Sequence, residues 1–209
     1  MSVLEKISEN LQIGNANGVL ELIEKSIEEG LPTEDILNNG LIKGMSVVGR
    51  KFKDGEIFIP EVLIAARAMT KGIERLEPLL IESGVEPRGK LLIGTVQDDL
   101  HDIGKNLVSV MFRGAGFQVV DLGVNITVDR FVEEAKKHTP DVIGLSALLT
   151  TTMVNMEGIV KALRENGNKS IIIIGGAPVT EEYARLINAD LYARTAVEGV
   201  DKALGLMAS

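Results

Sequence analysis

The sequence predicts an α/β protein in which a four-helix bundle precedes a five-stranded parallel sheet. Before about residue 82, apolar residues recur at spacings of three and four, which is typical of amphipathic helices. After residue 90, short runs of branched apolar residues alternate with helix-length amphipathic segments, which is typical of a parallel sheet covered on both faces. We therefore expect a helical bundle at 1–82, a linker rich in Gly, Pro and charge at 83–90, and a sheet domain at 91–209.

The expected bundle rests on three series of apolar residues that follow the helical period, after a short opening helix. Pro60 suits the first turn of the last helix, where its missing N–H costs nothing. The three series are Leu20, Ile23, Ile27 and Leu31; Leu37, Leu41, Met45, Val48 and Phe52; and Val62, Ala65, Met69, Ile73, Leu76 and Leu80. Four helices of this kind bury their apolar faces best against one another.

The expected sheet rests on five apolar runs separated by amphipathic segments. The runs lie at 90–96, 117–123, 142–148 and 170–177, with a weaker one from Asp190. Helices are expected to begin near Ile103, Val128, Thr152, Thr180 and Val197. This alternation predicts parallel strands joined by helical crossovers.

Composition narrows the classes of partner. The formal charge of −8 would repel a phosphate backbone, and only 3% of residues are aromatic, with no Trp to stack on bases. Nucleic acid is therefore not expected as a partner. The chain has no Cys, which excludes disulfides and thiolate metal sites. No apolar run approaches the length of a membrane span, and no signal peptide opens the chain, so we expect a cytoplasmic protein without a membrane partner.

The stretch "TVQDDLHDIGKN" places His101, one of only two histidines, between aspartates at the end of the first strand. Ligands of open parallel sheets bind at the carboxyl ends of the strands. The segment from Ser146 to Thr152 follows the third strand, and the pair Gly175-Gly176 follows the fourth. We expect these three loops to converge on one edge of the sheet.

Two interpretations of His101 are open from its position. It could simply start a helix that Asp99 caps. Alternatively it could ligate a metal through one ring nitrogen while Asp99 holds the other. The only other histidine, His138, belongs to a polar run, and there is no Cys. A bound metal must then bring most of its own ligands, as it does in a macrocycle.

At this point a resemblance becomes specific. "DLHDIG" at 99–104, "SALLTTT" at 146–152 and "GG" at 175–176 resemble the D-x-H-x-x-G, S-x-L and G-G pattern of base-off/His-on cobalamin-binding domains. Residues 39–69 resemble the helical cap of the methyltransferase corrinoid proteins, a family similar to the cobalamin module of methionine synthase. The resemblance covers nearly the whole chain and implies a Rossmann-like, flavodoxin-like sheet domain.

The resemblance implies roles for individual residues. His101 would be the lower axial ligand of cobalt in place of the cofactor's own dimethylbenzimidazole, with Asp99 and Thr152 completing a relay. Gly104, Gly175 and Gly176 would leave room for the displaced nucleotide tail. Further cofactor contacts would come from Asp98, Leu100, Asp102, Ile103, Ser146, Leu148, Thr150 and Ala196, and from the cap residues Phe52, Ile59 and Val62.

Plainer interpretations of the same residues stay open. The paired glycines could form an ordinary turn, and Thr152 could cap a helix. The three cap residues could be bundle core.

The family's chemistry implies a carrier that turns over nothing alone. Its cobalamin would alternate between methylcob(III)alamin and cob(I)alamin. A substrate:corrinoid methyltransferase would load the methyl group, and a corrinoid:acceptor methyltransferase would pass it to coenzyme M or tetrahydrofolate. A reductive activase is expected as a further partner. Because a carboxylate favours a protonated imidazole, Asp99 would couple protonation of His101 to the oxidation state of cobalt. The methyl donor is left open.

Three other classes of protein compete with the methyl carrier. A cobalamin-dependent sensor would need a DNA-binding element and, for a photoreceptor, a Trp. The small subunit of an adenosylcobalamin mutase normally lacks the cap. A phospho-acceptor regulator would use Asp98, Asp99 and Asp102 but leaves His101 unexplained.

The chain also departs from the family's pattern at three positions. Many relatives have Gly where this chain has Asp98. Asn188 and Thr195 stand where Gly and Asp are common.

Overall fold

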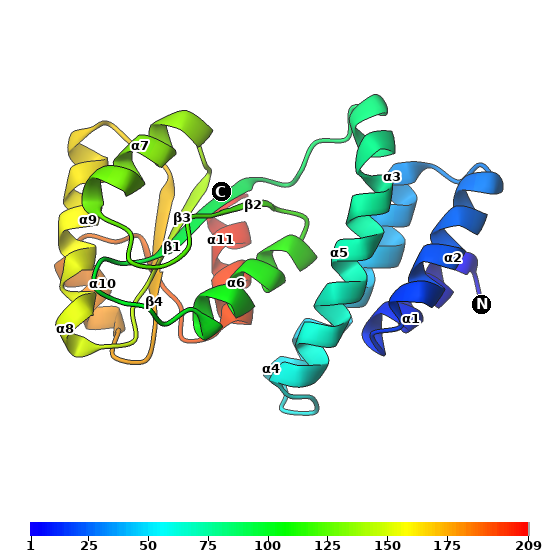
Figure 1. The fold of residues 1–209 in the computed structure, drawn as a ribbon, viewed down its shortest axis with the longest axis horizontal. Coiled ribbons are helices and arrows are strands. Elements are labelled where there is room, and N and C mark those ends of the chain that lie inside the picture. The colour runs from blue at the N-terminus through cyan, green and yellow to red at the C-terminus, as the bar shows by residue number, and fades with distance from the viewer. Residues whose placement is uncertain (209) are drawn as a thin grey trace. The chain divides into compact units, whose positions relative to one another are not determined.

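The computed structural model describes residues 1–208 and divides the chain into two compact units. The first consists mainly of Met1–Arg88, and the second mainly of the chain from Gly89 onward. The division falls within the linker expected at 83–90. In Figure 1 the first unit is drawn in blue to cyan-green, and the second in green to red.

The first unit is helical. Its elements are α1 (Val3–Gln12), α2 (Ala16–Glu28), α3 (Thr33–Asp35), the π-helical segment η1 (Ile36–Ile42), α4 (Lys43–Lys53) and α5 (Ile59–Glu82). Because α3, η1 and α4 follow one another without a break, the unit contains four helices, which confirms the predicted bundle. Ser2 caps α1 by accepting the N–H of Glu5 at 3.2 Å, and the Asn15 side chain caps α2. Pro60 lies in the first turn of α5, as predicted.

The core of this unit comes from the apolar stripe of each helix. Ile7 and Leu11 of α1, Ile23 of α2 and Leu76 of α5 are fully buried. Gly72 allows α5 to approach Leu41, since a Cβ there would lie 2.8 Å from that side chain. The spacing of buried residues therefore matches the helical period that the sequence shows.

The second unit is a five-stranded parallel sheet with strand order β2-β1-β3-β4-β5, which confirms the predicted fold. The strands are β1 (Lys90–Thr95), β2 (Gln118–Asp121), β3 (Val142–Ser146), β4 (Ile171–Gly175) and β5 (Leu191–Tyr192). The helices are α6 (Ile103–Gly114), α7 (Val128–His138), α8 (Thr150–Met153), α9 (Asn155–Glu165), α10 (Glu181–Leu186) and α11 (Ala196–Met207). The helix expected from Thr152 is thus two helices with a break at Val154.

Helices cover both faces of the sheet, as Figure 1 shows: α7 to α10 lie on one face and α6 and α11 on the other. On the first face Phe131 of α7 and Ile159 of α9 pack with Ile143 of β3 in one apolar cluster. On the second face Phe112 of α6 is fully buried, and its ring meets that of Phe117 edge-on at 5.0 Å. Burial on both faces explains why β3 and β4 read as continuous apolar runs.

The strand order also locates a topological switch point. The chain leaves β1 for β2 on one side and returns to β3 on the other. Thr95, Ser146 and Gly175 form one row across the carboxyl ends of β1, β3 and β4. The loops that follow these strands start side by side, which is the place where such sheets bind ligands.

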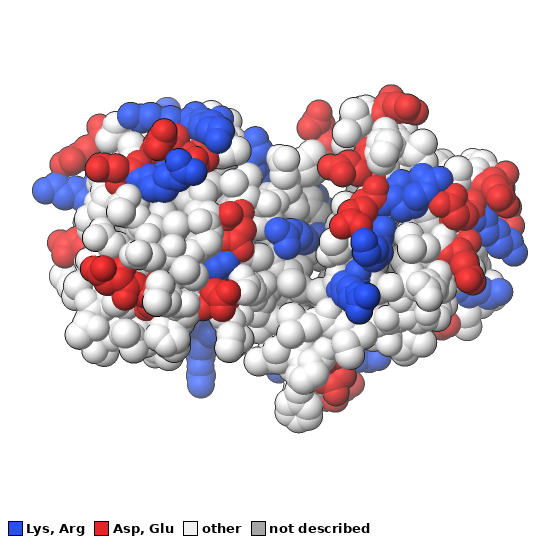
Figure 2. All heavy atoms as spheres, viewed as in Figure 1, with Lys and Arg blue, Asp and Glu red and all other residues white. Residues whose placement is uncertain are grey.

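Figure 2 shows acidic and basic side chains interspersed over the face that it draws. Among residues 1–208, no helix is both long and apolar enough to cross a membrane.

Candidate functional site

The loop between β1 and α6 is held in an unusual backbone conformation. Asp98 has a φ of 65°, in the left-handed region that Gly adopts freely and Asp tolerates. The Gly that the resemblance predicts here would suit this backbone, and Asp suits it as well. Asn188 also has a positive φ, 58°. At both positions the residue present tolerates a left-handed backbone.

Asp99 is fully buried and accepts four hydrogen bonds. One carboxylate oxygen accepts the backbone N–H of His101 at 3.0 Å and pairs with its ring Nδ1 at 2.8 Å. The other accepts the backbone N–H of Leu148 at 2.8 Å and the hydroxyl of Thr152 at 2.6 Å. Burial alone would raise the pKa of Asp99, but the hydrogen bonds from Thr152, Leu148 and His101 lower that pKa well below its usual range.

The ring of His101 is left with one nitrogen available. Its side chain is 50% exposed, and Nδ1 is directed at Asp99. A carboxylate partner assigns the N–H to Nδ1, so Nε2 carries the lone pair that a metal needs. The backbone carbonyl of His101 accepts the hydroxyl of Thr95 at 3.0 Å, which fixes the residue from a second side. Asp99 therefore orients His101 and does not cap α6, which begins only at Ile103.

The loop after β3 supplies the partners of Asp99. Thr152, the third member of the predicted relay, is buried in α8, and its hydroxyl also lies 3.1 Å from the carbonyl of Leu149. Leu148 contributes its backbone N–H, while its side chain is exposed. Ser146 is partly buried at the end of β3, and Thr150 is exposed at the start of α8. The structure thus brings Asp99, His101 and Thr152 together across 53 residues of sequence.

The three predicted glycines have different surroundings. A Cβ on Gly176 would lie 1.8 Å from the carbonyl oxygen of Ala147, and its φ is 131°. A Cβ on Gly175 would lie 3.0 Å from the carbonyl oxygen of Ala193. These two positions are therefore explained by close packing of loops within the sheet unit. Gly104 meets nothing within 4 Å, so open space lies before it.

Large apolar side chains lie exposed in the same loops. Leu100 and Ile103 are 71% and 73% exposed, and Leu148 and Leu149 are 44% and 43% exposed. Soluble proteins rarely leave such residues together at the surface unless something covers them. A flat ligand with a large apolar area suits this edge of the sheet.

The remaining predicted contact residues are placed as follows. Asp102 accepts the side-chain amide of Asn106 at 3.0 Å, and Ala196 is buried at the start of α11. In the helical unit Val62 is fully buried, Ile59 is 40% exposed and Phe52 is partly buried. Their contacts with a cofactor remain predictions.

Several residues that shape the site were not predicted from the sequence. Asn125 bonds to the backbone of Asp98 and Asp99, and Asn155 bonds to the carbonyl of Gln97 at 2.8 Å. The hydroxyl of Thr95 was missed as well. The "GVN" at 123–125, in which Asn125 comes two residues after a Gly that follows the second strand, is the one sequence signal that could have drawn attention to Asn125.

The residues that the structure describes support neither a metal site made only of protein side chains nor a phospho-acceptor site. Within residues 1–208, no group of three His, Cys, Asp or Glu side chains could hold a metal ion. The carboxylate of Asp99, which a phospho-acceptor cluster would need, is saturated by its four donors.

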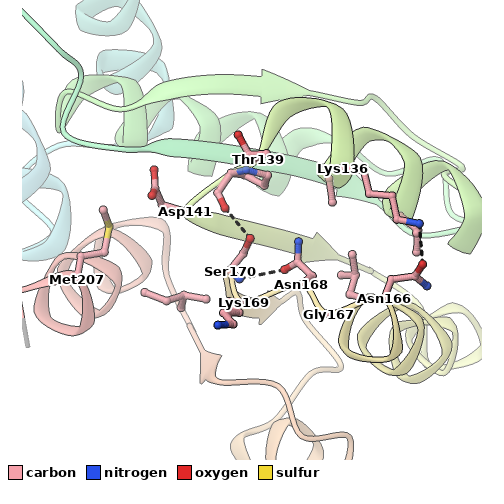
Figure 3. Close-up of a pocket in the computed structure, with 14 residues that line it drawn as sticks. Lys136, Thr139, Asp141, Asn166, Gly167, Asn168, Lys169, Ser170 and Met207 are labelled. Carbon is pink, nitrogen blue, oxygen red and sulfur yellow. Dashed lines mark hydrogen bonds between the residues drawn. The ribbon is translucent and has the colours of Figure 1, made fainter.

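A hollow of about 590 Å³ lies at the opposite, amino-terminal edge of the sheet, lined by the ends of α7 and α9 and the start of β4 (Figure 3). Its polar groups bond to one another: Lys136 to Asn166 at 2.6 Å, and the hydroxyl of Ser170 to the carbonyl of Pro140 at 2.5 Å. Five-residue strands separate this edge from His101 by roughly 16 Å. The hollow is therefore not part of the histidine site.

Comparison with protein families identifies the class. Residues 89–203 match a model described as the B12 binding domain, and residues 3–77 match a second model with the same description. The first match covers more than half of the chain and includes the loop of His101 and both glycine positions. The fold and the site thus define a B12-binding protein.

Similar proteins narrow the class further. The chain is 40% identical to the dimethylamine corrinoid protein of Methanosarcina barkeri over 99% of this chain and 98% of that protein. It is 39% identical to a corrinoid protein of Desulfitobacterium hafniense over 97% and 96% of the two chains. Among solved structures, a chain of the methanol:cobalamin methyltransferase complex of Methanosarcina barkeri matches with a TM-score of 0.91 and 30% identity, covering 99% of this chain and 80% of that one.

The chain belongs to the family of methyltransferase corrinoid proteins, and its cofactor is a corrinoid. The comparisons give no support to the sensor.

Proposed function

We propose that the protein carries methyl groups between two methyltransferases, with Nε2 of His101 as the lower axial ligand of its cobalamin. The observation that carries this assignment is the hydrogen-bonded series Thr152–Asp99–His101, which ends in a half-exposed ring nitrogen. When bound, the corrin supplies four nitrogen ligands and a cobalt that accepts and releases the methyl group.

The residues of the chain fit such a group. Imidazole is a suitable cobalt ligand, and the carboxylate bonded to its other ring nitrogen fixes its tautomer and direction. The exposed side chains of Leu100, Ile103, Leu148 and Leu149 offer an apolar surface to a macrocycle. The open space before Gly104 leaves room for a nucleotide tail next to the histidine.

The protein's own part in the chemistry is to hold His101 and its protons. With Nδ1–H bonded to Asp99, Nε2 is free to bind metal; when Nε2 is not bound to metal, it can hold a proton. In either case the carboxylate of Asp99 is placed to bond to Nδ1. Thr152 and the N–H of Leu148 keep that carboxylate in place in both situations.

Methyl donor, acceptor and further partners are part of the proposal. Relatives named dimethylamine and trimethylamine corrinoid proteins are 39–44% identical to this chain, which supports a methylated amine as the donor. We expect a substrate:corrinoid methyltransferase to load the protein and a second methyltransferase to pass the methyl group to coenzyme M or tetrahydrofolate. A reductive activase would restore oxidised cofactor, and all of these proteins would act in the cytoplasm.

The axial ligand can be tested by reconstituting the purified protein with hydroxocobalamin and recording EPR spectra of the Co(II) form. We expect nitrogen splitting from a protein imidazole in the wild type and its loss in His101→Ala. His138→Ala is the matched control, because His138 is the only other histidine and bonds instead to Glu134 at 2.9 Å. A wild-type protein that retains no corrin would contradict the proposed function.

The donor class can be tested separately. The reduced holoprotein is mixed with a dimethylamine methyltransferase and dimethylamine, or with a methanol methyltransferase and methanol, and loading is followed by absorption. Faster loading in the dimethylamine mixture is expected. Faster loading from methanol would transfer the assignment to that donor.

A further inference from the structure

The loop that carries His101 is fastened to the loop after β2 by two reciprocal hydrogen bonds. The backbone N–H of Asp98 donates to the side-chain oxygen of Asn125 at 2.8 Å. In return, the backbone N–H of Asn125 donates to the carbonyl of Asp99 at 3.0 Å. Asp98 and Asn125 both have left-handed backbones, with φ of 65° and 57°. The two loops therefore form a clasp with Asn125 on one side.

This clasp begins where the sheet stops supporting the loop. The pairing of Val96 with Ile126 is the last bridge between the two segments. After Val96, the two hydrogen bonds with Asn125 hold the peptide group before Asp98 and the peptide group after Asp99. Fixing these two peptide groups fixes the direction in which the Asp99 side chain leaves the backbone. That side chain in turn directs Nδ1 of His101.

We infer that Asn125 is a positioning residue for the axial histidine and acts through Asp99. The inference rests on the proposed function, because it concerns the aim of Nε2 at cobalt. Asn125 itself is exposed, and its hydrogen bonds are directed at the backbone of Asp98 and Asp99. Its effect is therefore on the geometry of His101.

The residue type is explained by two requirements that few side chains meet together. A φ of 57° strains most residues but is tolerated by Asn, Asp and Gly. The bond from Asp98 needs a short side chain with an acceptor oxygen, which Asn and Asp have and Gly lacks. Asn125→Gly therefore keeps the backbone and removes the acceptor, while Asn125→Asp keeps both. Because the side chain is exposed, neither change leaves a cavity in the core.

The experiment measures hydroxocobalamin affinity and the Co(II) EPR spectrum of the reconstituted variants. We expect Asn125→Gly to bind hydroxocobalamin about tenfold more weakly, the lower end of the effect of outer-shell partners on metal affinity. Its EPR spectrum should contain a fraction without nitrogen splitting. Asn125→Asp should restore the wild-type spectrum and affinity. Thermal unfolding of each apoprotein checks that the fold is intact.

Asn188→Gly is a matched control, since Asn188 is also exposed with a φ of 58° but lies before β5. It should leave affinity and spectrum unchanged. Wild-type affinity and full splitting in Asn125→Gly would overturn the inference, as would equal losses in Asn125→Gly and Asn125→Asp. Both results leave the wild-type splitting in place, so they are distinct from a failure of the proposed function, in which the wild type itself shows no imidazole signal.

Discussion

The two edges of the sheet each carry a carboxylate that binds backbone N–H groups, but they use it differently. At the amino edge, Asp141 is exposed and accepts the N–H of Lys90 at 2.7 Å. At the carboxyl edge, Asp99 is buried, accepts four donors and directs His101. A hollow of about 590 Å³ lies at the amino edge, whereas the proposed histidine site lies at the carboxyl edge. That site is marked by the free ring nitrogen of His101 and not by the hollow.

The largest effect is expected from a glycine at the carboxyl edge. Gly176→Ala should lower the free energy of unfolding by about 3 kcal/mol or more, because its Cβ would overlap the carbonyl oxygen of Ala147 at a positive φ. Gly104→Ala should leave stability unchanged or raise it by up to about 1 kcal/mol, because open space surrounds a helical position. Urea unfolding measures both.

The same two variants separate packing from ligand binding. We expect Gly104→Ala to weaken hydroxocobalamin binding, since the added methyl group takes up room beside His101. A Kd equal to that of the wild type would remove Gly104 from the cofactor pocket. A stable Gly176→Ala would show that the two loops can move apart.

Aspartate-to-asparagine exchange compares the edges directly. All four partners of Asp99 are donors. In Asp99→Asn the new NH₂ group, itself a donor, must face two of them, so those bonds are lost. We expect the free energy of unfolding to fall by about 2 kcal/mol. Asp141→Asn keeps an oxygen for Lys90 and should change stability by less than about 0.5 kcal/mol.

Only the exchange at the carboxyl edge is expected to change the reduction potential of cobalt. Asp99→Asn should also shift the Co(II)/Co(I) potential measured by spectroelectrochemistry, because it removes the charge behind His101. Asp141→Asn should leave that potential as it is. Equal potentials in all three proteins would contradict the relay.

A smaller effect is expected from Thr152, because Asp99 keeps three donors without it. Thr152→Val should cost about 1.5 kcal/mol, the lower end of the value of one hydrogen bond to a charged group. Thr152→Ser retains the hydroxyl and serves as the control. If Val and Ser variants unfold at the same urea concentration, the hydroxyl is not a significant partner.

The smallest effect concerns acid stability in α7. The side chain of Glu134 is buried beside Arg130 at 2.8 Å and His138 at 2.9 Å. Burial would raise its pKa, but Arg130, Lys137 and His138 lower the pKa of Glu134 below its ordinary value. A lowered pKa in the folded protein stabilises it above the ordinary value near 4.5, and this contribution is lost as pH falls through and below that value.

Thermal unfolding between pH 7 and 3 tests this assignment. Glu134→Gln should be less stable than wild type near pH 7, and the difference should shrink toward pH 3. Cobalamin binding should not change, since Glu134 lies outside the histidine site. A constant difference across the pH range would contradict the assignment.

Most of the fold could be predicted because periodicity reports burial directly. The four helices of the first unit follow from the apolar spacing that an amphipathic helix must show, and the strands follow from short continuous apolar runs. The break at Val154 and the π-helical turn in η1 could not be predicted, because apolar spacing indicates that a segment is helical but not which backbone hydrogen bonds it makes. Short β5 was expected only as a weak run, since two residues give little signal.

The parts of the site that could be predicted are side chains that form a motif. The parts that could not be predicted are backbone groups and backbone conformations. His101 and Asp99 were found through their place after the first strand, and Thr152 through the resemblance to the cobalamin-binding pattern. The N–H of Leu148 and the left-handed backbones of Asp98 and Asn125 leave no comparable pattern, since a main-chain donor is the same in every residue. Gly176 was predicted to leave room for a nucleotide tail, and its close packing against Ala147 could not be predicted without the fold.

The exposed leucines and isoleucine around His101 have a practical consequence for handling the protein. Without its corrin, the chain displays four large apolar side chains from neighbouring loops, which is the kind of surface through which proteins associate unspecifically. A corrin bound over these side chains would therefore also keep copies of the chain apart. Expression in a host that makes no corrinoid should yield self-associating material, and hydroxocobalamin added during purification should disperse it.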